Sequence, residues 1–234
     1  MRLTNLLPAS ASVIVLGVSA AAASTIVLDF EGINSEYPSS SYAFIQDYYN
    51  DGTSSDGTSG TDFGVAFSPN AQAICLNTPG NVCSNTSRGG QGNPDSQLGG
   101  LFFLTGAATF MNVAAGFSDG FSFFYTAPTQ SGSVSVFDGL DGTGNQLATL
   151  ALPTTPSQCT GVAADFCPFF PIGVSFSGTA QSVSFAGVAN QIVFDDVTFG
   201  SSTPGNTTVI PLPAGLPLLL GALGMLGLLR RRKG

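Results

Sequence analysis

Apolar and small polar residues alternate with a period of two along most of the chain. The pattern is clearest in four segments: SVSVFDG (133–139), GVSFSG (173–178), SVSFAG (182–187) and QIVFDDVTFG (191–200). Such alternation is typical of strands that bury one face, and the glycine, serine and threonine residues between the segments are typical of turns. Phe121, Phe123 and Tyr125 likewise fall on one face of a strand. We therefore predict an all-β antiparallel sandwich with no long helix before the C-terminal tail.

Polar regions interrupt this pattern at three places. Residues 37–62 form a long polar excursion that holds four of the five tyrosines, which either stack on sugar rings or cover the end of the sandwich. The glycine-rich stretch DGLDGTGN (138–145) predicts a hairpin turn, because its aspartate spacing does not match a calcium loop. Residues 201–208 are predicted to form a short polar linker.

Both ends of the chain carry targeting patterns. Arg2, an apolar stretch and three alanines before Ser24 predict a signal peptide over residues 1–23. Residues 209–229 contain 21 residues without a charge, which is enough for a helix that spans a membrane. The predicted order is a signal peptide (1–23), a β-sandwich domain (24–200), a linker (201–208) and a C-terminal segment (209–234). The domain is expected to be exported through the inner membrane and anchored by the terminal helix.

The charges are distributed very unevenly. Residues 24–208 carry all fourteen acidic side chains against one basic side chain, Arg88, which gives a net charge of −13. Nucleic acid is therefore excluded as a partner, whereas cations suit such a domain. The chain has no histidine, which excludes a Ser-His-Asp triad and histidine-bound zinc.

Four cysteines occur as two local pairs. Seven residues lie between Cys75 and Cys83, and seven lie between Cys159 and Cys167. In an exported domain this pattern favours two disulfides that close short loops, although the sequence alone permits three connectivities. Zinc is the weaker alternative, because structural zinc sites favour closer cysteine pairs.

The C-terminal segment resembles a known sorting signal. Its proline motif is followed by a Gly/Leu-rich span and a basic tail, and the residues are Val209, Pro211, Leu212, Pro213 and Ala214, with Arg230, Arg231, Arg232 and Lys233. This arrangement is similar to the PEP-CTERM class in its VPLPA-type variant, with Ile210 inserted. The resemblance implies recognition and removal of the tail by a membrane-embedded exosortase, in a Gram-negative bacterium that exports exopolysaccharide.

The first and last predicted strands carry acidic residues. LDFEG (28–32) and FDDVTFG (194–200) resemble the terminal strands of galactose-binding-like jelly rolls and carbohydrate-binding modules, in which these strands meet and often hold a structural calcium ion. The resemblance implies Glu31 and Asp195 as ligands, with Asp29 and Asp196 as reserves. Strict alternation would also place Asp195 on the same face as Val193, Val197 and Phe199, where a carboxylate needs a partner. The alternative is that these acids are solvated strand ends.

Three functions follow from these observations. The first is a non-catalytic surface or extracellular-matrix protein, associated with exopolysaccharide. The second is a carbohydrate-binding module with a structural calcium ion, although the absence of tryptophan argues against it. The third, a secreted hydrolase, has little support, since Glu31 and Glu36 are the only glutamates and lie in one segment. We therefore expect no enzymatic activity and no catalytic residues.

Overall fold

The computed structural model describes residues 25–35, 37, 42–84, 86–93 and 96–205. The predicted signal peptide, the sorting motif, the membrane span and the basic tail lie outside these residues. Within them the chain forms twelve strands and one short 3-10 turn, Leu140–Gly142. The strands are β1 (Ile26–Leu28), β2 (Tyr42–Phe44), β3 (Val65–Phe67), β4 (Ala71–Cys75), β5 (Gly99–Phe103), β6 (Ala108–Phe117), β7 (Gly120–Thr126), β8 (Gly132–Phe137), β9 (Gln146–Leu152), β10 (Phe170–Ser175), β11 (Ala180–Gly187) and β12 (Val193–Phe199).

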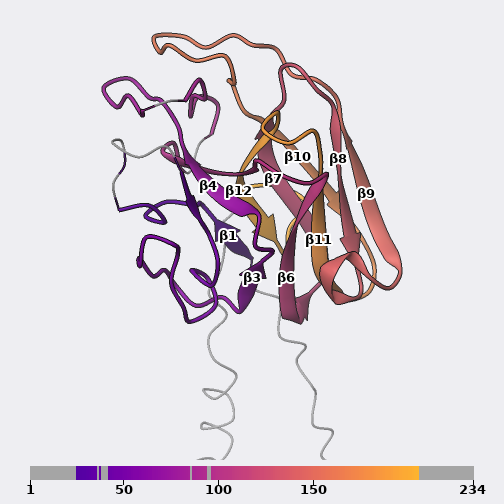
Figure 1. Ribbon diagram of the computed structural model, residues 1–234. Coiled ribbons are helices and arrows are strands. Elements are labelled where there is room, and N and C mark those ends of the chain that lie inside the picture. Colours follow the sequence, from indigo (N-terminus) through magenta and orange to yellow (C-terminus); the bar gives the residue numbers. More distant parts are fainter. Residues whose placement is uncertain (1–24, 36, 38–41, 85, 94–95, 206–234) are drawn as a thin grey trace, which may run out of the picture. The chain divides into compact units, whose positions relative to one another are not determined.

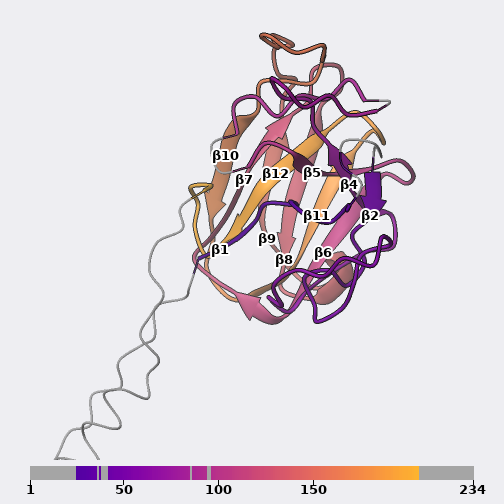
Figure 2. The same cartoon turned by 90° about the vertical axis from the view of Figure 1, so that its left-hand side faces the viewer.

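The strands form two sheets that pack face to face (Figures 1 and 2). The seven-stranded sheet has the order β10-β7-β12-β5-β4-β2, with β1 paired to β12 beside this path. The five-stranded sheet has the order β3-β6-β11-β8-β9. Every pair of named strands is antiparallel. The prediction of an antiparallel β-sandwich is therefore confirmed, and the four alternating segments contribute to β8, β10, β11 and β12.

The main core fills the space between the two sheets and is rich in phenylalanine. Phe185 of β11 lies 4.9 Å from Phe194 of β12 and 6.1 Å from Phe123 of β7, measured between ring centroids. All three rings are fully buried, and burying a ring of this size contributes about 1.5–3 kcal/mol. Phe121, Phe123 and Tyr125 all belong to this core, as the alternation predicted.

A second apolar cluster lies on the opposite face of the seven-stranded sheet. It consists of Ile74, Leu76, Phe102, Phe124, Phe169 and Val193. Leu76 follows the first cysteine, and Phe169 follows the last one. Leu76 in the first disulfide loop and Phe169 just after the second thus extend an apolar cluster on the face turned away from the main core.

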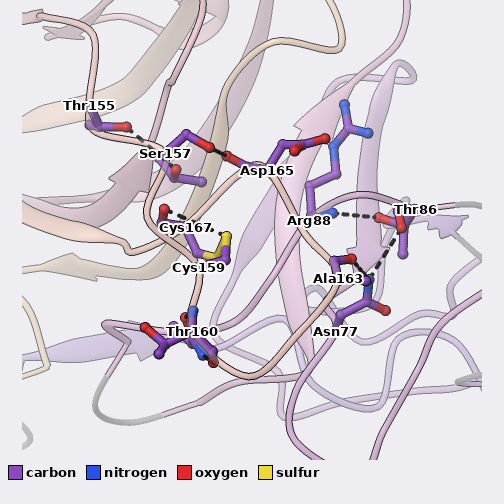
Figure 3. The surroundings of a disulfide bond; sticks show 12 residues. Asn77, Thr86, Arg88, Thr155, Ser157, Cys159, Thr160, Ala163, Asp165 and Cys167 are labelled. Carbon is purple, nitrogen blue, oxygen red and sulfur yellow. Dashed lines mark hydrogen bonds between the residues drawn. A yellow bond between two sulfur atoms is a disulfide. The ribbon is translucent and has the colours of Figure 1, made fainter.

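The cysteines pair locally, as the spacing predicted. Disulfides join Cys75 to Cys83 and Cys159 to Cys167, and no cysteine of the described residues is free. Figure 3 shows how the two loops meet: the Asn77 side-chain amide donates to the carbonyl oxygens of Thr86 and Ala163, at 3.2 Å each. A residue of the first loop therefore holds the backbone of the second.

The tyrosine-rich excursion covers the end of the sandwich. Tyr48 and Tyr49 are buried in the main core, with their rings 4.8 Å apart at 88°. The hydroxyl of Tyr48 donates to the carbonyl oxygen of Glu31, and the hydroxyl of Tyr49 accepts from the amide of Phe30. For these two side chains the covering role is the correct interpretation, whereas Tyr42 on β2 stays 40% exposed.

The glycine-rich stretch between β8 and β9 is a turn, as predicted. Asp138 accepts from the backbone amide and the side-chain amide of Asn145, and Asp141 accepts from the Asn112 amide. The Asp138 carboxylate thus closes the hairpin, whereas Asp141 ties the turn to Asn112 on β6.

Candidate functional site

The first and last strands are neighbours, which the predicted calcium site requires. Ile26 lies opposite Phe199, and Leu28 lies opposite Val197. The upstream half of β12 pairs instead with β5, through Phe194 and Leu101. β12 therefore changes partner from β5 to β1 near Asp195 and Asp196, and the candidate site lies at this junction.

A β-bulge marks the junction. Against β7, the register of β12 shifts between Asp195 and Thr198, and Asp196 adopts a left-handed backbone with φ of 46°. A bulge adds a residue to one strand and reverses the face on which later side chains lie. Accordingly Val193 belongs to the second apolar cluster, on the opposite face of the sheet, whereas Val197 and Phe199 belong to the main core. The expectation that Asp195 shares a face with all three is wrong, because strict alternation ends at the bulge.

Asp195 is nevertheless fully buried. Its Oδ2 accepts hydrogen bonds from the Asn93 side-chain amide and, at 3.2 Å, from the Ser96 hydroxyl. Its Oδ1 accepts from the backbone amide of Asp196 at 2.7 Å. Burial, followed by the charge of Asp196, raises the pKa of Asp195 well above its ordinary value. The carboxylate form therefore needs a counter-charge to be stable in this place.

Glu31 makes a different set of contacts. Its Oε1 accepts from the backbone amides of Leu98, at 2.7 Å, and Gly99, at 3.0 Å, where β5 begins. Burial raises the pKa of Glu31, and the two amide hydrogen bonds partly offset that rise. Glu31 thus fastens the turn after β1 to the start of β5, and its carboxylate makes no hydrogen bond to Asp195.

Asp29, the reserve just after β1, has an exposed side chain. Its Oδ1 accepts from the backbone amide of Glu31 at 3.2 Å and from the Tyr49 hydroxyl at 3.5 Å. Its carbonyl oxygen is closer to the junction, since it accepts from the Ser96 hydroxyl at 3.1 Å. Ser96 therefore bridges the backbone of the first strand and the carboxylate of the last.

Sequence reasoning missed the segment that connects the two predicted ligands. Residues 93–99 supply Asn93 and Ser96 to Asp195, and they supply two backbone amides to Glu31. The segment includes no periodic pattern, and its only signal is a run of turn-forming residues between two glycines. Gly99 lies directly against the backbone of Phe30, since a Cβ on Gly99 would lie 2.1 Å from the Phe30 carbonyl oxygen.

Two buried oxygen atoms near Asp195 have no hydrogen-bond partner among the described residues. They are Oδ1 of Asn93, a residue only 2% exposed, and the hydroxyl of Tyr37. Burial raises the pKa of Tyr37, and the charges of Glu31, Asp56 and Asp195 raise it further. A buried polar atom without a partner costs about 1–3 kcal/mol, so the Asn93 oxygen is available to coordinate a cation.

The donor chemistry at the junction fits a hard cation. Asp195 supplies a carboxylate and Asn93 an amide oxygen. Ser96 supplies a hydroxyl and Asp29 its backbone carbonyl oxygen. Calcium takes six to eight oxygens of these kinds. In the described part of the chain, no group of three or more His, Cys, Asp or Glu side chains is placed to hold a metal. A cation at this junction would therefore depend on neutral oxygens as well as on acids.

Arg88 does not neutralise the site. Its Nη2 donates to the carbonyl oxygen and the Oδ1 of Asn190, at 2.7 and 2.6 Å, and its guanidinium lies 4.5 Å from the centre of the Phe166 ring. The one basic residue of the predicted domain thus joins the turn between β11 and β12 to Phe166 of the second disulfide loop.

No protein-family model matches the sequence, and no curated protein is similar enough to it to count as a relative. Over the described residues there is no helix with the length and apolar character needed to cross a membrane.

Proposed function

We propose that the chain is an exported, non-catalytic cell-surface or extracellular-matrix protein that an exosortase sorts through the VPLPA-type signal. The observation that carries this proposal is the oxidation of all four cysteines into two local disulfides. Disulfides of this kind persist outside the reducing cytoplasm. They therefore support export, which the two terminal targeting patterns predict independently.

The non-catalytic role is supported by how the candidate acids are used. A glycosidase needs one carboxylate that donates a proton and a second one across the sugar. Glu31 instead accepts two backbone amides, and Asp195 is enclosed by Asn93 and Ser96. Both carboxylates are thus engaged within the fold, and we assign them to holding the strands together.

The second candidate, a carbohydrate-binding module of the jelly-roll type with a structural calcium ion, is favoured by the Asn93 amide. Its Nδ2 contacts Asp195 while its Oδ1 has no partner in the described residues. Rotating the amide by 180° would bring Oδ1 to the carboxylate, an arrangement that a cation between the two oxygens would stabilise. Bound calcium would supply the positive charge that Asp195 needs. Asp195, Asn93, Ser96 and the carbonyl oxygen of Asp29 would hold it, with Glu31 and Asp196 beside it.

Sorting is tested by the intact mass of the protein isolated from its native host. We expect a species that lacks residues 1–23 and the tail beyond about Pro213. Deletion of the exosortase is the control, and it should leave the tail in place and the protein in the membrane. A mature species that retains Arg230 to Lys233 in the presence of exosortase would reduce the C-terminal segment to a simple anchor.

A further inference from the structure

An exposed aromatic patch lies on the outer face of β2. Tyr42 and Phe44 are 40% and 37% exposed, and the residue between them, Ala43, is buried in the main core. Their rings lie 6.4 Å apart at 89°, and Tyr42 also lies 6.0 Å from the buried ring of Phe102 on β5. Among the described residues, these are the exposed large aromatic side chains.

A buried glutamine, Gln72, lies between Phe44 and Phe102 in the register of the sheet. Gln72 on β4 is directly opposite Phe44 on one side and Phe102 on the other, and paired residues of antiparallel strands share a face. Gln72 is only 5% exposed, and its Oε1 has no hydrogen-bond partner within the described part of the chain. An acceptor left unpaired beside exposed rings is unfavourable for folding alone. It is well suited to a ligand that brings a hydroxyl donor together with an apolar face.

The edge of β2 is closed to an added strand. The backbone amide of Phe44 donates to the Ser55 hydroxyl at 2.9 Å, and its carbonyl oxygen accepts from the Ser55 amide at 3.0 Å. An extended peptide therefore finds no free backbone ladder at this residue. What the patch offers is side chains on the face of the sheet.

We infer that Tyr42, Phe44 and Gln72 form a binding site for a neutral polysaccharide. The C–H faces of a sugar stack on the exposed rings, and a sugar hydroxyl donates to Oε1 of Gln72 once the Phe44 ring turns aside. The polymer is neutral because a domain with a net charge of −13 repels an anionic one. This inference names the site for the proposed association with exopolysaccharide and rests on that function.

Affinity electrophoresis tests the site directly. The full chain, purified in a mild detergent, is run in native gels that contain dextran, galactomannan or xylan, with alginate as the anionic comparison. We expect retardation by at least one neutral polymer and none by alginate. Tyr42→Ala and Phe44→Ala should each weaken binding about tenfold. Val188→Ala, which truncates an apolar side chain that is 51% exposed elsewhere on the surface, is the matched control and should bind normally.

Gln72→Met separates a ligand-binding role from a structural one. The substitution keeps the length of the side chain and removes the unpaired acceptor, so thermal stability should hold or rise while binding weakens about fivefold. Absence of retardation by every neutral polymer, or retardation that survives Tyr42→Ala and Phe44→Ala, would overturn the site. A concentration-dependent dimer abolished by Phe44→Ala would instead make the patch a contact between copies and would also overturn it.

Sorting and glycan binding fail separately in these experiments. A protein that is processed normally and binds no polysaccharide keeps the sorting proposal and overturns the site. A protein that retains its tail and binds a neutral polymer overturns the sorting proposal and keeps the binding site.

Discussion

Substituting Asp195 by asparagine gives opposite effects with and without calcium. The asparagine side chain has nearly the shape of the native one and keeps a carbonyl oxygen for the hydrogen bond from the amide of Asp196. Its NH2 group replaces Oδ2, and a rotated Asn93 amide can accept from it through the otherwise unpaired Oδ1. The substitution removes the negative charge that burial disfavours and that a cation requires. We therefore expect the Asp195→Asn variant to be more stable than the wild type in chelator and less stable in calcium.

The size of the effect follows from mass action. Calcium at a hundredfold excess over its dissociation constant stabilises the folded state by about 2.7 kcal/mol. In a domain of about 150–250 residues, 1 kcal/mol shifts the unfolding midpoint by about 2–4 °C. The wild type should therefore unfold about 5–10 °C higher in calcium than in EDTA, and Asp195→Asn should lose most of this difference.

Thermal unfolding of the full chain in a mild detergent measures both effects, with circular dichroism as the signal. Asp47→Asn is the matched control, because Asp47 is an exposed acid and should keep the full calcium response. A wild-type midpoint that EDTA leaves unchanged, or a calcium shift of full size in Asp195→Asn, would refute the cation site and leave Asp195 as a buried structural acid.

Three further predictions follow from the same structure. Burial raises the pKa of Asp195 in the folded state, so in EDTA its contribution to stability is greatest below the ordinary pKa of about 4 and is lost as the pH rises through the raised pKa. When unfolding is measured as a function of pH, the difference in unfolding free energy between Asp195→Asn and wild type should therefore widen from acid to neutral pH. Limited reduction followed by alkylation and peptide mapping should open Cys159–Cys167 first, since Cys159 is partly exposed while Cys75 is fully buried; equal rates would contradict this order. Gly99→Ala should lower the unfolding free energy by about 1–3 kcal/mol in urea titrations, because its Cβ would collide with the Phe30 carbonyl; a neutral outcome would mean that β1 can move aside.

The sandwich could be predicted from the sequence because burial of one strand face imposes a period of two. Phe121, Phe123 and Tyr125 all lie in the main core for this reason. The local pairing of the cysteines could also be predicted from their spacing, since cysteines close in sequence in an exported domain favour disulfides that close short loops. The adjacency of β1 and β12 was anticipated only through resemblance, because no local property of either segment specifies a partner so far along the chain.

The junction was only partly predictable. A bulge at Asp196 depends on how β12 meets β7 and on its change of partner from β5 to β1, and alternation alone cannot reveal it. Asn93 and Ser96 were missed for a similar reason, because a turn segment carries no periodic signal. The exposed pair on β2 was hidden among the tyrosines of the polar excursion, two of which are buried.

The position of β12 also constrains the order in which the chain folds under the proposed export. The last strand lies inside the seven-stranded sheet and pairs with β1, β5 and β7, so Phe199 meets Ile26 across nearly the whole length of the domain. Contacts so distant in sequence are slow to form, and during export they cannot begin before the end of the domain has crossed the membrane. Until then β7 and β5 lack their common neighbour. The emerging chain would therefore expose the edges of β5 and β7, where strand-to-strand aggregation can begin, until β12 takes its place.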